Sequence, residues 1–305
     1  MKTRFTLGLS IALLFGGVAH AQQATQDQPT GDLVPPTSAS DFTAGQLDAV
    51  LAGSWRSANN KARDVYRHPK ATLQFFGLQP DKTVIEITPG GGWYTEILAP
   101  LLRDNGHYIA AVPGGNGSEE RQDADTLRAR FKADPTEYGK AAVVTFNPKA
   151  PVLGPAGSAD MVLTFRNVHN WTMAGNAEAM FKAFYAVLKP GGTLGVVDHR
   201  AAPGANLDAI KSSGYLPTDY VIKLATDAGF KLDGQSEINA NPKDTKNYSK
   251  GVWTLPPTLT LGDQDRDKYL AIGESDRMTL RFVKAGTTKA PGTPAPASSA
   301  GSKAH

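Results

Sequence analysis

A glycine-rich turn is the clearest candidate for a chemical site in this sequence of 305 residues. Pro89-Gly90-Gly91-Gly92 follows a short apolar run that carries one acid, Glu86, and precedes an apolar helical pattern that begins at Tyr94. Glycines between a strand and a helix let backbone N–H groups approach a ligand, and the helix N-terminus adds positive potential. The pattern therefore predicts a small-molecule site, with a tight turn that holds no ligand as the alternative.

Polar residues also follow two later apolar runs. The segment 166–171, which contains His169, comes after one run, and Asp198-His199-Arg200 ends another. Because an imidazole titrates near neutral pH, His169 either acts as a general base, with Asp198 as its partner, or only hydrogen-bonds in a pocket wall. The spacing of these residues does not favour a metal site, so we predict no metal.

Helical and strand patterns alternate along the chain. The expected helices cover residues 41–56, 59–76, 94–102, 119–131, 177–188 and 218–228, and the expected strands cover 83–87, 107–112, 142–146, 160–165, 193–198, 230–238 and 277–284. This order predicts an α/β fold with a doubly wound, mostly parallel sheet. Ligands of such sheets bind beyond the carboxyl ends of the strands, which is where the three polar segments lie.

The long connection 239–276 contains proline and glycine and is expected to form a flap or insertion. Three charged residues at its end, Glu274, Asp276 and Arg277, either close over the site or pair with one another.

The first residues match a secretory signal peptide. Lys2 and Arg4 precede an apolar run over 7–18 that ends at the small-residue cleavage sequence Ala19-His20-Ala21. The run is too short to span a membrane stably. We therefore expect a periplasmic mature protein without an integral membrane segment, organised as a signal peptide (1–21), a flexible linker (22–40), a folded domain (41–284) and a disordered tail (285–305).

The composition excludes several classes of site. The sequence has no cysteine, which rules out disulfides and thiolate metal sites. Lys2 and Arg4 account for two of the 32 basic residues, so the expected mature chain carries 30 basic against 29 acidic residues. This near-neutral balance gives no electrostatic reason to expect nucleic acid as a partner. The sequence patterns of serine-hydrolase elbows, zinc-protease helices and phosphate-binding P-loops are also missing.

Three segments in order resemble class I S-adenosylmethionine-dependent methyltransferases. The series Glu86-x-Thr88-x-Gly90-x-Gly92 resembles motif I of that family, residues 160–171 resemble its fourth-strand motif, and residues 188–194 resemble the turn into its fifth strand. The resemblance covers residues 73–284. Together with the signal peptide, these motifs make the sequence similar to a group of exported bacterial predicted methyltransferases. It implies a seven-stranded Rossmann-like sheet with an antiparallel last strand.

The same resemblance implies a cofactor and a reaction. S-adenosylmethionine would bind over the turn, and its methyl group would pass to a small-molecule or envelope acceptor near His169 and Asp198. The cofactor-binding residues implied are Glu86, Thr88, Gly90, Gly91, Gly92, Trp93, Tyr94 and Asn167. A non-catalytic small-molecule-binding protein that retains the fold is the alternative function, and an open space above Gly90, as opposed to one filled by Trp93 and Trp171, would distinguish the two.

Two positions depart from the family pattern. Thr88 replaces the first glycine of motif I, which we expect the backbone to tolerate with a negative φ. The acid that holds the ribose hydroxyls is missing after the second strand, where backbone groups of residues 114–116 are the candidates to replace it.

Several side chains keep two interpretations. Glu86 either faces the cofactor's amino group or caps N–H groups of the turn. The aromatic residues Trp93, Tyr94 and Trp171 either lie against the sulfonium of the cofactor or pack in the core.

Overall fold

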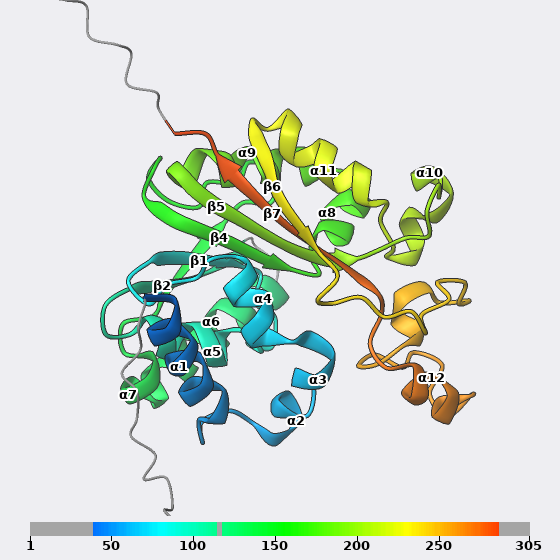
Figure 1. Ribbon diagram of the computed structural model, residues 1–305, viewed down its shortest axis with the longest axis horizontal. Helices are drawn as coiled ribbons and strands as arrows, with labels where there is room; N and C mark the ends of the chain where they lie inside the picture. Colours follow the sequence, from blue (N-terminus) through cyan, green and yellow to red (C-terminus); the bar gives the residue numbers. More distant parts are fainter. Residues whose placement is uncertain (1–38, 115–117, 287–305) are drawn as a thin grey trace, which may run out of the picture. The chain divides into compact units, whose positions relative to one another are not determined.

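A seven-stranded sheet forms the centre of the folded chain (Figure 1). The computed structural model describes residues 39–114 and 118–286. The strands are β1 (Thr83–Ile87), β2 (His107–Pro113), β3 (Ala142–Phe146), β4 (Ala159–Phe165), β5 (Leu188–His199), β6 (Phe230–Ser236) and β7 (Arg277–Lys284).

The strand order is β3-β2-β1-β4-β5-β7-β6, and only β7 runs antiparallel to its neighbours. The predicted seven-stranded, mostly parallel sheet with an antiparallel last strand is therefore confirmed.

Helices cover both faces of this sheet, as Figure 1 shows. One face carries α1 (Ala39–Ala52), α4 (Pro69–Phe75), α5 (Thr95–Leu102), α6 (Ser118–Ala133) and α7 (Pro135–Tyr138), and the other carries α8 (Val168–Ala174), α9 (Ala177–Val187) and α11 (Thr218–Asp227). Each face has its own apolar cluster. Because successive strand residues point to opposite faces, Ile85 and Ile87 enter the cluster beneath α9, whereas Val84 enters the cluster beneath α5. Glu86 shares the face of Val84.

Short helices and one long connection lie outside these layers. The short helices are α2 (Ala58–Lys61), α3 (Asp64–Arg67), α10 (Leu207–Ile210), the 3₁₀ turn η1 (Lys211–Ser213), the 3₁₀ turn η2 (Gly251–Thr254) and α12 (Arg266–Ile272). The last two belong to the β6–β7 connection (residues 237–276), which leaves the sheet at the edge where the parallel strands end (Figure 1).

The structure differs from the sequence prediction in three helical segments. The expected helix over 59–76 is divided into α2, α3 and α4, because His68 precedes Pro69 and adopts a left-handed φ of 42° that ends α3. The expected helix over 41–56 ends at Ala52, directly before Gly53. The segment after β4, for which the sequence analysis proposed no helix, forms α8.

The predicted signal peptide and nearly all of the predicted linker and tail lie outside the described residues. Helix α1 begins at Ala39, two residues inside the predicted linker. Among the described residues, none of the helices has the length and apolar character needed to cross a membrane.

Candidate functional site

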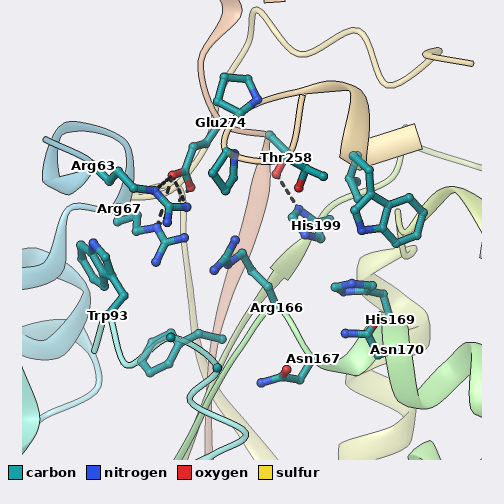
Figure 2. Close-up of a pocket in the computed structure, with 18 of the residues that line it drawn as sticks. Arg63, Arg67, Trp93, Arg166, Asn167, His169, Asn170, His199, Thr258 and Glu274 are labelled. Carbon is teal, nitrogen blue, oxygen red and sulfur yellow. Dashed lines mark hydrogen bonds and ion pairs between the residues drawn. The ribbon is translucent and has the colours of Figure 1, made fainter. Parts of the chain in front are cut away.

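A pocket of about 330 Å³ lies beyond the carboxyl ends of β1, β4 and β5 (Figure 2). One wall is the turn after β1, from Thr88 to Trp93. A second wall comes from α2 and α3, and a third from the segments that follow β4 and β5. The β6–β7 connection closes over it with Trp253, Pro256, Glu274 and Ser275 among others. The polar segments that the sequence predicted to share one edge of the sheet do lie together.

The turn after β1 is open on its pocket side. A Cβ atom added to Gly90 or Gly91 would meet no atom within 4 Å. Gly90 has a φ of 55°, which a glycine adopts without strain. The space above Gly90 is thus open and is not filled by Trp93 and Trp171.

Thr88 contradicts the expectation of a negative φ. Its φ is 48°, a conformation that a β-branched residue adopts only with strain. Its N–H donates to the Ala111 carbonyl at 2.7 Å, which holds the turn against β2. Its Oγ1 is buried and makes no hydrogen bond within the described chain, although Thr88 lines the pocket. A strained residue with an unsatisfied hydroxyl is typical of a ligand clamp.

Asn167 braces the turn from the neighbouring strand. Its Nδ2 donates to the Ile87 carbonyl at 2.9 Å and lies 3.4 Å from the Thr88 carbonyl oxygen. The side chain therefore couples the end of β4 to the end of β1, and it also lines the pocket.

Glu86 lies beneath α5 and outside the pocket-lining set. Its side chain is 2% exposed, and Oε2 accepts from the Tyr108 hydroxyl at 2.5 Å and the Thr95 hydroxyl at 3.1 Å. Burial raises the pKa of Glu86 to about 7, although both hydroxyls act in the opposite direction. Its hydrogen-bond partners in the described chain are thus hydroxyls, and the predicted capping of N–H groups of the turn is not among its contacts.

The three aromatic residues lie in different surroundings. Trp93 lines the pocket, and its Nε1 donates to the Asn60 carbonyl at 2.8 Å. Tyr94 stacks on Phe165 with ring centroids 3.5 Å apart and is not part of the pocket wall. Trp171 packs against Phe184 in the core beneath α8 and α9. Of these three aromatic residues, Trp93 is the one that lines the pocket and could lie against a bound cation.

Gly92 is buried behind the turn. An added Cβ would approach the Arg130 Nη1 atom to 2.7 Å, so a close contact and a φ of 78° both favour glycine here. It supports the turn and does not itself line the pocket.

His169 and Asp198 form the pair that the sequence suggested. Asp198, at the end of β5, accepts from the backbone N–H groups of Val168 (2.7 Å), His169 (3.3 Å) and His199 (2.7 Å). Its Oδ1 also lies 2.9 Å from the Nδ1 atom of His169. Because Asp198 is the acceptor in these contacts, Nδ1 of His169 carries a proton, and in the neutral imidazole the lone pair is then on Nε2. Figure 2 shows the ring of His169 at the pocket wall.

His199 lies beside this pair. Its Nδ1 atom is 2.5 Å from the Ser275 hydroxyl, and its ring centroid is 4.9 Å from that of His169. Burial, followed by the charges of His169 and nearby arginines, lowers the pKa of His199 well below its usual value. The side chain is therefore neutral at physiological pH.

His169, Asp198 and His199 place one potential ligand atom each within 4.8 Å of one another, a spacing that suits a metal ion. However, both Asp198 oxygens already accept hydrogen bonds, and each histidine uses its Nδ1 atom in another contact. The pKa of His199 is also lowered by the positive charges of Arg166, Arg277 and Arg67. This positive surrounding disfavours a cation, so we do not assign a metal to the cluster.

An arginine cluster forms the wall opposite His169. Glu274 is contacted by Arg63 at the N-cap of α3, by Arg67 in α3 and by Arg277 in β7, at N–O distances of 2.7, 3.2 and 3.0 Å. Of the three acids and bases near the last strand, Glu274 and Arg277 therefore pair with each other, whereas Asp276 pairs with Arg200 at 2.8 Å. The sequence analysis did not select Arg63 and Arg67, although their spacing of four residues places them on one helix face.

Comparisons with solved structures identify the fold. The chain is similar to an S-adenosylmethionine-dependent methyltransferase from Aquifex aeolicus, with 13% identity, a TM-score of 0.50 and coverage of 79% of this chain and 98% of the other. It is also similar to a proposed sarcosine dimethylglycine methyltransferase from Galdieria sulphuraria, with 12% identity, a TM-score of 0.52 and coverage of 80% and 98%. No protein-family model and no curated protein sequence matches the chain. The protein has the class I methyltransferase fold.

Proposed function

We propose that this protein is an S-adenosylmethionine-dependent methyltransferase whose acceptor binds in the pocket between the glycine turn and His169. The supporting observation is that one pocket joins an open, strained turn after β1 to an imidazole whose Nδ1 is held by a buried carboxylate. This arrangement occurs at the edge where ligands of such sheets bind.

The residues around the turn fit the methionine end of the cofactor. The space above Gly90 and Gly91 is open, and the unsatisfied Oγ1 of Thr88 offers a hydrogen bond to a ligand. Thr88, Gly90, Gly91 and Trp93 would hold it, with Asn167 fixing the turn from behind. The bound cofactor supplies a methyl group on a positively charged sulfur. Backbone groups near Gly114 would have to take the place of the ribose acid, since β2 ends in Val112-Pro113-Gly114.

His169 would act as the general base in this reaction. Its Nε2 atom would take the proton of the acceptor hydroxyl or amine that the cofactor methylates. Asp198 keeps the imidazole in the required tautomer and stabilises the imidazolium that results. Removing such a base lowers a rate by roughly 10² to 10⁴. The other contribution is positioning, because Asn167 ties the end of β1, which leads into the turn, to the start of α8, which carries the imidazole.

Calorimetric titration with S-adenosylmethionine and S-adenosylhomocysteine tests the cofactor site. We expect binding to the wild type and loss of binding in Gly91→Val, because that side chain would occupy the open space without a positive φ to strain it. Gly90→Val should also lose binding, at the added cost of backbone strain.

Gly157→Val is the matched control for strain. Gly157 has a φ of 67° and open space around its Cβ position, but it lies outside the pocket wall. Its variant should keep wild-type affinity. A folded wild-type protein that binds neither compound would contradict the proposal and favour the non-catalytic binding protein.

The chain is also proposed to act outside the cytoplasm. Support comes from its sequence: the charged start, the apolar run over 7–18 and the cleavage sequence Ala19-His20-Ala21. We expect cell fractionation to find a protein that begins at Gln22 in the periplasm. Leu14→Arg should hold the uncleaved chain in the cytoplasm, and an unchanged distribution of that variant would contradict export by this segment.

A further inference from the structure

The pocket carries more positive charge than its own acids neutralise. The charged side chains that line the pocket are three arginines, Arg63, Arg67 and Arg166, and one acid, Glu274. The lining therefore carries an excess of two positive charges. Asp198, behind His169, also acts on Arg166. Asp198 also uses its oxygens to accept from His169 and three backbone N–H groups. A partly enclosed site with such an excess attracts anions.

Arg166 has no partner of its own. Its guanidinium makes no hydrogen bond and no ion pair within the described residues, although it lies in the middle of the pocket between Arg67 and His169 (Figure 2). Burial, together with the repulsion of Arg277 and Arg63, lowers the pKa of Arg166 to about 10, so the group still carries its charge at neutral pH. Arg166 is half-buried and faces the pocket, so a ligand that enters can pair with its guanidinium.

The backbone that presents Arg166 is itself strained. Its φ is 61°, a left-handed conformation that is uncommon for residues other than glycine. The Arg166 N–H donates to the Val197 carbonyl at 2.7 Å, which fixes this turn to β5. The turn leads directly into α8 and His169. The strain therefore orients a charged side chain next to the candidate base.

Arg67 supplies a second unsatisfied donor. Its side chain is 3% exposed, its guanidinium lies 4.6 Å from the centroid of the Trp93 ring, and its Nε contacts Glu274. Its Nη2 is buried without a hydrogen-bond partner in the described chain, and Arg67 lines the pocket. After burial, the charge of Arg166 is the largest cause that lowers the pKa of Arg67, so the two guanidiniums lie close together. Packing against Trp93 and Glu274 holds Arg67 in place before a ligand arrives.

We propose that Arg166 and Arg67 bind a small oxyanion, a carboxylate or a phosphate group, and that this group anchors the methyl acceptor beside His169. The second half of this inference rests on the proposed methyltransferase function. Planar guanidiniums suit both oxyanions, because two parallel N–H groups reach two oxygens at once. The anchored anion is not the nucleophile, since its electron pairs are engaged by two arginines. A volume of about 330 Å³, shared with the glycine turn, restricts the acceptor to a small molecule.

Calorimetric titration with inorganic phosphate and with acetate, at constant ionic strength and with S-adenosylhomocysteine present, tests the anion site. We expect one of the two anions to bind the wild-type protein and to bind Arg166→Gln at least tenfold more weakly, since hydrogen bonds to a charged group are lost. Tighter phosphate binding identifies a phosphorylated acceptor, and tighter acetate binding identifies a carboxylic acid. Arg128→Gln removes an exposed arginine of α6 that pairs with Asp125, and it should leave anion binding unchanged.

Thermal unfolding of the same variants separates ligand binding from a structural role. Arg166→Gln should not lower the melting temperature, because it removes a charge that has no partner in the described chain. A Gln variant that unfolds at a clearly lower temperature would show that Arg166 supports the fold and would overturn the assignment. Unchanged anion affinity in Arg166→Gln would overturn it as well.

The cofactor's own carboxylate could occupy the same site as the acceptor's oxyanion. Binding of 5′-methylthioadenosine, which lacks that carboxylate, distinguishes the two occupants. In one outcome, Arg166→Gln weakens the binding of S-adenosylhomocysteine but not of methylthioadenosine, and phosphate competes with S-adenosylhomocysteine. The arginines would then bind the cofactor, and the assignment to the acceptor would be wrong. If the anions bind through Arg166 but S-adenosylhomocysteine does not bind at all, the anion site stands and the methyltransferase proposal fails. If S-adenosylhomocysteine binds and neither anion does, the methyltransferase proposal stands and this inference fails.

Discussion

Glu86 and Glu274 are both almost completely buried, with 2% and 3% of their surface exposed, but their surroundings have opposite effects. Glu86 meets two neutral hydroxyls, and burial raises its pKa to about 7. Burial would also raise the pKa of Glu274, but the charges of Arg277, Arg67 and Arg63 together lower it to about 2. The negative charge of a glutamate is thus poorly compensated beneath α5, at Glu86, and strongly compensated at the pocket, at Glu274.

This difference separates two parts of the molecule. The turn after β1 belongs to the sheet, and its acid is part of the packing beneath α5. The arginine cluster is assembled from the α3 region, the turn after β4 and the start of β7, and its acid, Glu274, comes from the β6–β7 connection. The contrast suggests that the first region supports the cofactor turn and that the second provides recognition of the acceptor.

Removing Glu274 should have the largest effect on stability. Glu274→Gln leaves buried arginines without their counter-charge, and loss of one partner of a buried ion pair costs about 3–5 kcal/mol. Chemical unfolding would measure the loss. Glu237→Gln is the control, because Glu237 pairs with Arg200 while 72% of its side chain is exposed, and it should cost at most about 1 kcal/mol. Equal effects of the two substitutions would contradict a special role of Glu274.

The two acids should also give opposite pH dependence. The folded pKa of Glu86 is raised from 4.5 to about 7, so its stabilising contribution is complete below pH 4.5 and is lost as the pH rises to 7. This difference of pKa values corresponds to about 3 kcal/mol. Glu86→Gln should remove that part of the pH dependence, as measured by unfolding between pH 4 and 8.

Glu274 shows the reverse behaviour, because its folded pKa is lowered from 4.5 to about 2. Its contribution is complete above pH 4.5 and is lost as the pH falls toward 2.

Tyr108→Phe sharpens the test of Glu86. The Tyr108 hydroxyl lowers the Glu86 pKa, so its loss should move the fall in stability to higher pH. A Glu86→Gln variant with the same pH profile as the wild type would refute the raised pKa.

Relief of strain at Thr88 should have the smallest effect. Thr88→Gly removes a β-branched side chain at a φ of 48° together with an unsatisfied hydroxyl, and we expect a gain of about 1 kcal/mol in unfolding free energy. Thr226→Gly in the exposed part of α11 should instead lose roughly 0.3 kcal/mol, because glycine is an even poorer helix former than threonine. A stability loss at position 88 would show that the turn is not strained.

The sequence was sufficient to predict the sheet and much of the glycine turn. The strands at 83–87 and 142–146 have the predicted bounds, since buried parallel strands are short apolar runs between turn residues. Asn167, His169 and Asp198 were selected because they follow strands whose carboxyl ends must meet at one edge. Periodicity was less informative about the helices around Pro69 and about α8, where a preceding turn or a proline decides the boundary.

Local pattern alone could not predict which side chains meet across the pocket. Residue type and spacing determined the alternation of strands and helices, the glycine turn and the placement of His169 and Asp198 at one sheet edge, because these depend on backbone periodicity and on strand ends. Only the tertiary structure brought Arg63 and Arg67 to Glu274, more than 200 positions away along the chain. It also placed Arg166 between them and His169, without an ion pair within the described residues. Charge compensation inside a fold acts through space, so its balance is decided only when distant segments pack together.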